Sequence, residues 1–184
     1  MGGKIILGLD PGSIIMGFGI IEANEIGSCV QLVEYGVFQL KSYREHMLRM
    51  RHIYTNTMDL LQQYAPDEVA IEAVFHGANV QSMLKLGRAQ GVAIAAALAC
   101  EIPVTEYAPR KVKQSVTGKG DASKEQVAAM VGRLLGISTA SALLDASDAL
   151  AVAICHSQQR PIAMNKSKSW VQFVAANPTR ITSN

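Results

Sequence analysis

The chain has 184 residues, of which 49% are hydrophobic and 17% are charged, a balance typical of one globular domain and not of a disordered segment. Lys and Arg number 17 against 15 Asp and Glu, so the net charge of +2 points to no partner by itself. The longest apolar run, from Gly91 to Cys100, is too short to span a bilayer. We therefore expect a globular protein with one core and no membrane segment.

The first half of the chain predicts three consecutive strands, a helix and a fourth strand. Continuous apolar character predicts the first and second strands, and the alternation of Val33, Tyr35 and Val37 predicts the third. A stripe of apolar residues that recur every three or four positions predicts the helix, which Pro66 ends, and consists of Met47, Met50, Tyr54, Met58 and Leu61. These five elements are expected at residues 4–9, 17–23, 30–40, 43–64 and 68–75.

The second half predicts a long helix, a short strand and three further helices. Pro109 suits the first turn of a short basic helix. Ser123 and Gln126 match a capping box at the start of the next helix, and its apolar stripe includes Val127, Val131 and Leu134. The long helix, the strand and the last helix are expected at residues 78–99, 102–107 and 142–157.

This order of elements predicts an α/β fold with one mixed central sheet and helices packed on it. Three strands in succession imply an antiparallel meander, and the strand-helix-strand units add parallel neighbours. Beyond residue 157 the chain carries Arg and Lys but no acid, and it holds the only tryptophan, Trp170. We therefore expect one domain over residues 1–157 and a basic tail over 158–184.

Four acids stand where carboxylates are costly to bury. Asp10 ends the first apolar strand, Glu72 lies within an apolar strand, and Asp145 and Asp148 are three positions apart at the start of a helix. A helix dipole explains the last two equally well, and a buried salt bridge is the simpler alternative for Glu72. Because the two strands can be neighbours and the helix is apolar enough to lie on them, we favour one shared site.

Carboxylates that converge repel one another, and a hard divalent cation relieves this repulsion. Mg²⁺ prefers oxygen ligands and retains water, so one or two carboxylates per ion and a substrate phosphate suffice. Four acids match a site with two metal ions that hydrolyses a phosphodiester. We expect two Mg²⁺ ions, with Mn²⁺ as a substitute.

Basic residues gather just ahead of the Asp145–Asp148 pair, at Arg110, Lys111, Lys113, Lys119, Lys124 and Arg133. A helix-loop-helix with this charge suits a nucleic-acid backbone, although a solvated face explains charge alone equally well. Phe75, just beyond Glu72, is a candidate for stacking on a base, with core packing as the alternative.

The three cysteines, Cys29, Cys100 and Cys155, are widely spaced in apolar segments, and none has metal-ligand spacing. We expect buried free thiols and a reducing, cytoplasmic setting. The four histidines are interpreted as surface or core residues, with His46 and His52 on the exposed face of the first helix.

Five segments of this chain resemble the RuvC family of bacterial Holliday junction resolvases, in the order of the family's motifs. They are LGLDPGS with the following GFG, IEAVF, LKLGRAQGVA, EYAPRKVKQSVTG and DASDALAVAI, and together they span about residues 4–156. The resemblance implies an RNase H-like fold with a five-stranded sheet covered by helices on both faces. It also implies a homodimer that nicks two strands of a four-way DNA junction symmetrically and depends on Mg²⁺.

The resemblance gives roles to particular residues. Asp10, Glu72, Asp145 and Asp148 match the family's metal-binding catalytic acids, Phe75 its base-stacking aromatic, and Lys113 and Lys124 its DNA-contacting lysines. Lys119 joins the DNA-binding candidates through its charge, although the family requires no basic residue there. The long helix at residues 78–99 corresponds to the dimer element, and the family acts with the RuvA–RuvB branch-migration complex in DNA recombination and repair.

Two other classes of function compete with this interpretation. Asp10-Pro11-Gly12-Ser13 also looks like the first phosphate loop of actin-like ATPases and sugar kinases, but those proteins need two such halves and a longer chain. A module that binds junctions without cutting them is the other alternative, and the presence of all four acids argues against it.

Overall fold

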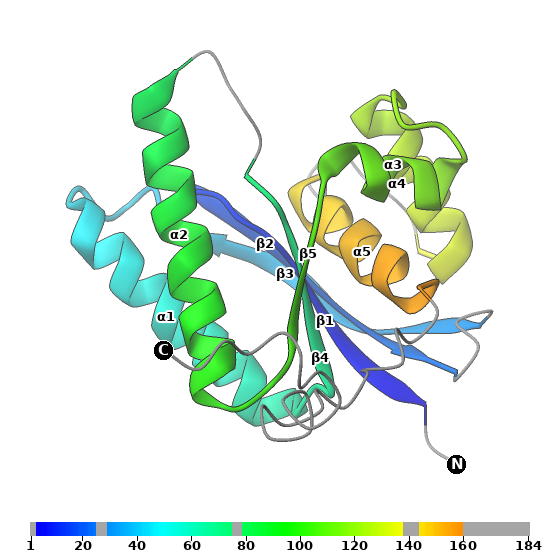
Figure 1. The fold of residues 1–184 in the computed structure, drawn as a ribbon, viewed down its shortest axis with the longest axis horizontal. Coiled ribbons are helices and arrows are strands. Elements are labelled where there is room, and N and C mark those ends of the chain that lie inside the picture. Colours follow the sequence, from blue (N-terminus) through cyan, green and yellow to red (C-terminus); the bar gives the residue numbers. More distant parts are fainter. Residues whose placement is uncertain (1–2, 25–28, 75–78, 138–143, 160–184) are drawn as a thin grey trace, which may run out of the picture.

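The computed structural model describes residues 3–24, 29–74, 79–137 and 144–159, and the side chains of Leu144 and Asp145 lie outside this description. A five-stranded sheet runs through the molecule in the order β3-β2-β1-β4-β5 (Figure 1). The strands are β1 (Lys4–Asp10), β2 (Ile15–Ala23), β3 (Val30–Gln39), β4 (Glu68–Glu72) and β5 (Val104–Tyr107). The helices are α1 (His46–Tyr64), α2 (Val80–Ala99), α3 (Pro109–Thr117), α4 (Lys124–Leu135) and α5 (Leu144–Ser157).

The sheet has the mixed topology that the order of elements predicts. Strands β1, β2 and β3 form an antiparallel meander, and β4 and β5 are added in parallel beyond β1. Strand β4 ends at Glu72 rather than at residue 75. Its last residue pairs with Tyr107, where β5 also ends, so no neighbouring strand continues the ladder.

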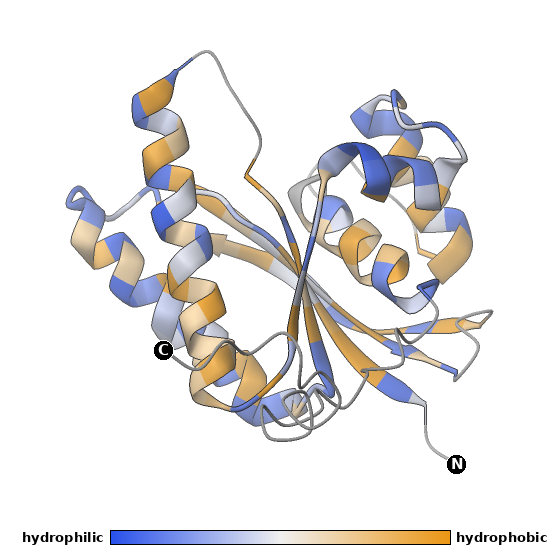
Figure 2. Cartoon of the chain, viewed as in Figure 1, coloured by the Kyte–Doolittle hydropathy of each residue, from blue (hydrophilic) through white to orange (hydrophobic). Residues whose placement is uncertain are grey.

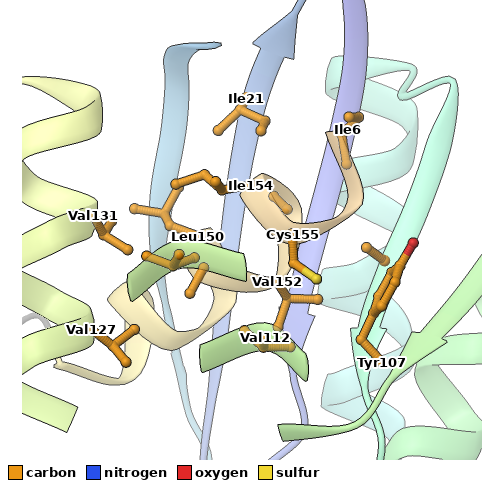
Figure 3. Close-up of a cluster of buried hydrophobic side chains, with 14 of the residues drawn as sticks. Ile6, Ile21, Tyr107, Val112, Val127, Val131, Leu150, Val152, Ile154 and Cys155 are labelled. Atoms are coloured by element: carbon orange, nitrogen blue, oxygen red, sulfur yellow. The ribbon is translucent and has the colours of Figure 1, made fainter. Parts of the chain in front are cut away.

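The helices cover both faces of the sheet, as expected, and each face has its own core. Helices α1 and α2 lie on one face, and α3, α4 and α5 lie on the other (Figure 1). Alternation along β1 sends Leu7 and Leu9 toward α1 and α2 and sends Ile6 toward α5. Figure 3 shows the core around α5, where Leu150, Val152 and Ile154 of this helix are labelled.

Helix α5 sits unusually close to the sheet because two paired strand residues are glycines. Gly8 of β1 and Gly19 of β2 are partners in the antiparallel ladder. A Cβ atom added at Gly8 would lie 2.2 Å from the backbone oxygen of Ala149, and one added at Gly19 would lie 2.6 Å from side-chain atoms of Leu150. The two glycines therefore set the height of α5 above the sheet.

Three side chains expected in the core are exposed. The exposed fractions are 68% for Met47, 42% for Tyr54 and 42% for Leu134. The buried face of α1 is rotated relative to the predicted stripe, because Ile53 and Leu60 contact the sheet side instead. Long side chains at the border of a helical stripe can point either way, and periodicity alone does not decide between the two.

The local signals at helix ends are confirmed, whereas the expectation for the cysteines holds only in part. Pro109 opens α3, and Ser123 and Gln126 form a reciprocal capping box at α4. All three cysteines are free, but only Cys155 is buried, Cys100 is half-buried and Cys29 is exposed next to the edge strand β3.

The histidines of α1 are less exposed than expected. His46 and His52 are both half-buried, and the ring of His52 stacks on Tyr43 with 3.7 Å between ring centroids. The division into a domain and a basic tail stays a prediction, because residues 160–184 lie outside the described part. Within that part, no helix is both long and apolar enough to cross a membrane.

Replacing Gly8 with Ala should destabilise the fold by about 3 kcal/mol, near the upper end of the usual range for an overpacked core. The added methyl group meets a backbone oxygen, which cannot rotate away. Gly19→Ala should cost less, since its nearest obstacles are atoms of the Leu150 side chain. Urea unfolding of both variants measures the difference, and a Gly8→Ala protein as stable as the wild type would contradict this account of α5.

Candidate active site

One pocket, with a volume of about 90 Å³, lies where β1 and β4 end beneath α3, α4 and α5. It collects three of the four predicted acids and two of the predicted lysines. Its lining consists of Asp10, Glu72, Val112, Lys113, Lys124, Val127, Asp148 and Ala151. The structure therefore brings together residues that are up to 138 positions apart in the chain, from Asp10 to Asp148.

The sheet itself places Asp10 and Glu72 side by side. Strands β1 and β4 are parallel, and the pairing of Leu9 with Ile71 makes Asp10 and Glu72 the next residues on adjacent strands. Both lie on the face that α5 covers, since Gly8 and Ala70, two positions earlier in the same strands, lie on that face. Two carboxylates thus leave the same edge of the sheet toward the same helix.

Helix α5 brings Asp148 to this pair. Ala149, the next residue, is the one whose backbone lies against Gly8, so the close approach of helix and strand also fixes Asp148. Its Oδ2 atom accepts a hydrogen bond from the Nζ atom of Lys124 at 2.8 Å. The sequence gives no sign of this partner, which is the first residue of α4.

Glu72 has a different environment from Asp148. It forms no ion pair within the described residues, so the alternative of a buried salt bridge is wrong for this part of the chain. Burial and, second to it, the negative charge of Asp148 raise its pKa to about 7, against the opposing effect of Lys124 and Lys113. Glu72 is therefore an acid that a cation would help to ionise.

A residue that sequence reasoning missed holds the end of β4. The Nε2 atom of Gln90, on α2, donates to the backbone oxygen of Glu72 at 3.1 Å and to the Oε2 atom of Glu106 at 3.0 Å. Its neighbours Ala89 and Ala93 are buried against the sheet. The only signal in the sequence is a polar residue close to the apolar face of a helix, and this does not reveal its partners.

A second network holds the other end of α5. The Tyr107 hydroxyl and the Nδ1 atom of His156 are 2.8 Å apart, and the Nε2 atom of His156 bonds to Glu68, which also pairs with Lys4. Burial would raise the pKa of Glu68, but hydrogen bonds from Lys4 and His156 overcome this and lower it. His156 thus has a structural role in tying α5 to β4 and β5.

Three predicted site residues are not in this pocket as the structure describes it. Lys119 lies in a separate depression between α3 and α4. Asp145 is in the first turn of α5, but its side chain lies outside the described part. Phe75 lies outside the described residues as well.

The pocket has the donors for a hard metal ion without being a ready-made cage. Nowhere in the described part do three or more Asp, Glu, His or Cys side chains come close enough to hold an ion by themselves. The acids of the pocket offer only oxygen donors, and Lys113 and Lys124 supply its positive charge. Helix α3, which carries Lys113, is mostly hydrophilic (Figure 2).

A family model and curated relatives of this chain agree on one family. The family model described as "Crossover junction endodeoxyribonuclease RuvC" matches residues 6–156. A protein of that name from Cytophaga hutchinsonii is 49% identical over 178 residues, which cover 97% of this chain and 88% of the relative. One from Bacteroides fragilis is 48% identical over 182 residues, with coverage of 97% and 96%.

Solved structures agree with this result. The RuvC structure of Thermus thermophilus superposes with a TM-score of 0.75 at 31% identity and covers 84% of this chain and 94% of its own. The same organism's RuvC in complex with a Holliday junction substrate gives a TM-score of 0.77 at 30% identity, with coverage of 84% and 93%. These likenesses confirm the expected RNase H-like fold.

The raised pKa of Glu72 predicts how the stability of the metal-free protein depends on pH. The folded protein keeps a proton that the unfolded chain loses above the ordinary value of 4.5. The contribution of Glu72 to stability is therefore fully present below pH 4.5 and is lost as the pH rises through about 7. At 1.36 kcal/mol per pH unit, the loss is about 3 kcal/mol.

Urea unfolding at pH 5 and pH 8 in chelator tests this dependence. Glu72→Gln cannot ionise, so its stability relative to the wild type should rise between the two pH values. Glu45→Gln, a change at an exposed acid before α1, should keep the slope of the wild type. Equal slopes for the wild type and Glu72→Gln would show that Glu72 is not held protonated.

Proposed function

The chain belongs to the RuvC family of crossover junction endodeoxyribonucleases, and on this premise we propose that it resolves four-way DNA junctions by paired, symmetric nicks in recombination and repair. The observation that carries the proposal is the pocket at the ends of β1 and β4, where Asp10, Glu72 and Asp148 meet two lysines. A relative at 30% identity has been solved with a Holliday junction substrate. Carboxylates beside cations suit a phosphodiester, which brings negative charge to the site.

The residues present fit a divalent metal ion. Asp10, Glu72 and Asp148 offer oxygen atoms, and Mg²⁺ needs only one or two carboxylates if substrate oxygens and water complete its shell. We assign these three and Asp145 to the binding of two Mg²⁺ ions, with Mn²⁺ as a substitute. Such ions, when bound, supply a nucleophilic water and stabilise charge on the attacked and leaving oxygens.

The lysines position the DNA backbone. Lys124 now neutralises Asp148, and a phosphate oxygen that enters the pocket competes for the same ammonium group. Substrate binding thereby releases a carboxylate oxygen at the moment when cations and phosphate arrive together. Lys113, which belongs to α3 and also lines the pocket, offers a second cation to the same backbone.

Phe75 is the candidate for a contact with the bases of the DNA. It follows the end of β4 by three positions, so the strand that carries Glu72 leads directly to it. We assign it to stacking on a base close to the cut, an interaction that any base can provide.

The exposed side of α2 fits a second copy of this chain. Apolar or small residues recur along it every three or four positions, and all are exposed in the single chain. They are Val80, Leu84, Gly87, Gly91, Ala95 and Leu98. A Cβ atom at Gly87 or Gly91 would meet nothing within 4 Å, which leaves room for another helix to approach closely.

A homodimer built on this stripe provides the two active sites that paired nicks require. By membership of the family, we also assign the RuvA–RuvB branch-migration complex as a partner and the cytoplasm, where the DNA lies, as the place of action.

Asp10→Asn and Asp148→Asn should each lower Mg²⁺-dependent cleavage of four-way DNA by more than about 100-fold. Loss of a mere hydrogen-bond partner of a metal ligand already costs about 10–100-fold. Junction binding should survive in both variants. Asp59→Asn, which changes an exposed acid on α1, is the matched control and should cut like the wild type. Cleavage by both site variants, or cleavage in chelator, would contradict the proposed chemistry.

Gly87→Leu should convert a dimer into a monomer without unfolding the chain, because the new side chain points into open space in the single copy. We expect the dissociation constant of the dimer to rise at least about tenfold, by sedimentation, and the two nicks to become uncoordinated. Gln62→Leu adds the same apolar bulk to an exposed position of α1 and should stay dimeric. A Gly87→Leu variant that sediments as a dimer would remove α2 from the interface.

A further inference from the structure

We propose that the depression between α3 and α4 binds a DNA-backbone phosphate that is not the one being cut. This inference rests on the proposed function, because it gives the same substrate a second contact. The depression has a volume of about 280 Å³. Its lining consists of Thr117, Lys119, Ala122, Gln126, Ala129, Met130 and Arg133.

The charge of the depression suits an anion. Two cations line it and no carboxylate does. Neither Lys119 nor Arg133 has an ion pair within the described residues, whereas Lys124 in the acid pocket is paired with Asp148. Arg133 lies in the last turn of α4, where the helix dipole favours a cation. Lys119 lies on the loop before α4, so the helix dipole does not explain its charge.

The loop that carries Lys119 has a defined backbone. The Oγ1 atom of Thr117 bonds to the backbone oxygen of Lys113 at 2.8 Å and accepts from the amide of Lys119 at 3.2 Å. Gly118 adopts the left-handed conformation that ends α3, with φ of 78°. Arg110 packs so closely on Gly120 that a Cβ atom there would lie 2.7 Å from its Cγ atom. The base of Lys119 is thus held beside the depression before any ligand binds.

The remaining lining offers a neutral donor and an apolar floor. The Oε1 atom of Gln126 accepts from the amide of Ser123 at 2.9 Å, as part of the capping box. This bond orients the amide nitrogen of Gln126 away from Ser123, where it can donate to a phosphate oxygen. Ala122, Ala129 and Met130 suit the hydrocarbon part of a deoxyribose.

The depression and the acid pocket lie on different faces of α4. Lys124 and Val127 line the acid pocket. The residues of α4 that line the depression recur at spacings of three and four, and they are Gln126, Ala129, Met130 and Arg133. A helix with its side chains is about 10–12 Å across. One strand of DNA rises about 3.4 Å per nucleotide, so the two sites hold phosphates that are several nucleotides apart or lie across a groove.

The test compares a double variant, Lys119→Gln with Arg133→Gln, with a charge-preserving double variant, Lys119→Arg with Arg133→Lys. Binding to four-way DNA is titrated from low to high salt, and single-turnover cleavage is measured at saturating protein with Mg²⁺. Each lost phosphate contact removes about 0.9 from the slope of log K against log salt. The first variant should lose about 0.9 in slope, for the one phosphate that both cations contact, and bind at least about tenfold more weakly. Its cleavage rate at saturation should match the wild type, and the charge-preserving variant should retain both properties.

The other outcomes overturn the inference. An unchanged DNA affinity and an unchanged salt slope in the first variant would exclude the second phosphate site. The same result is expected if the depression binds a protein partner instead. If the first variant cleaves more slowly at saturation but binds DNA as tightly as the wild type, these residues serve the cleavage reaction or the stability of the fold and not DNA binding. The wild type reports separately on the proposed function, since that fails only if the wild type itself does not bind and cut the junction.

Discussion

The close contact between α5 and the sheet is the constraint on which the site depends. Gly8 and Gly19 are paired across β1 and β2, and backbone and side-chain atoms of α5 fill the space that their Cβ atoms would occupy. This contact fixes the height and position of the helix and therefore the position of Asp148 above Asp10 and Glu72. At the other end of α5, the bonds from His156 to Tyr107 and Glu68 hold the helix against β4 and β5. A site built on such anchored elements keeps its geometry without help from loops.

Electrostatics in the pocket are only partly balanced, and this imbalance explains what the pocket can do. Lys124 neutralises Asp148, while burial and the charge of Asp148 hold the pKa of Glu72 at about 7. The protein alone therefore keeps the carboxyl group of Glu72 partly protonated at neutral pH. Cations and a phosphate change that balance together, because cations favour the carboxylates and the phosphate offers Lys124 a new partner. In the proposed function, the binding of metal ions and of DNA by these residues is therefore linked.

The two layers of helices divide the work in the proposed function. Helices α3, α4 and α5 surround the acid pocket and carry the cations proposed to contact DNA. Helix α2, in the other layer, presents an apolar stripe to the outside and sends Gln90 to the end of β4. One helix therefore borders both the proposed dimer interface and the strand that carries Glu72. Helix α2 therefore connects the proposed dimer interface directly to strand β4.

The sequence alone determined the α/β class, the mixed sheet implied by its connections, the capping box of α4, and the family. Those features depend on local patterns or on the order of motifs, and both can be identified in the linear sequence. It was wrong about Met47, Tyr54 and Cys29, because exposure depends on what lies opposite a side chain.

Only the tertiary structure decided that Lys124 pairs with Asp148, that Gln90 holds the end of β4, and that Lys119 stands apart from the acid pocket. It likewise decided that Glu72 has no ion pair within the described residues. These facts are distances between residues far apart in the chain. They are set by the register of β1 with β4 and by the height of α5 over two glycines, and no local pattern encodes either one.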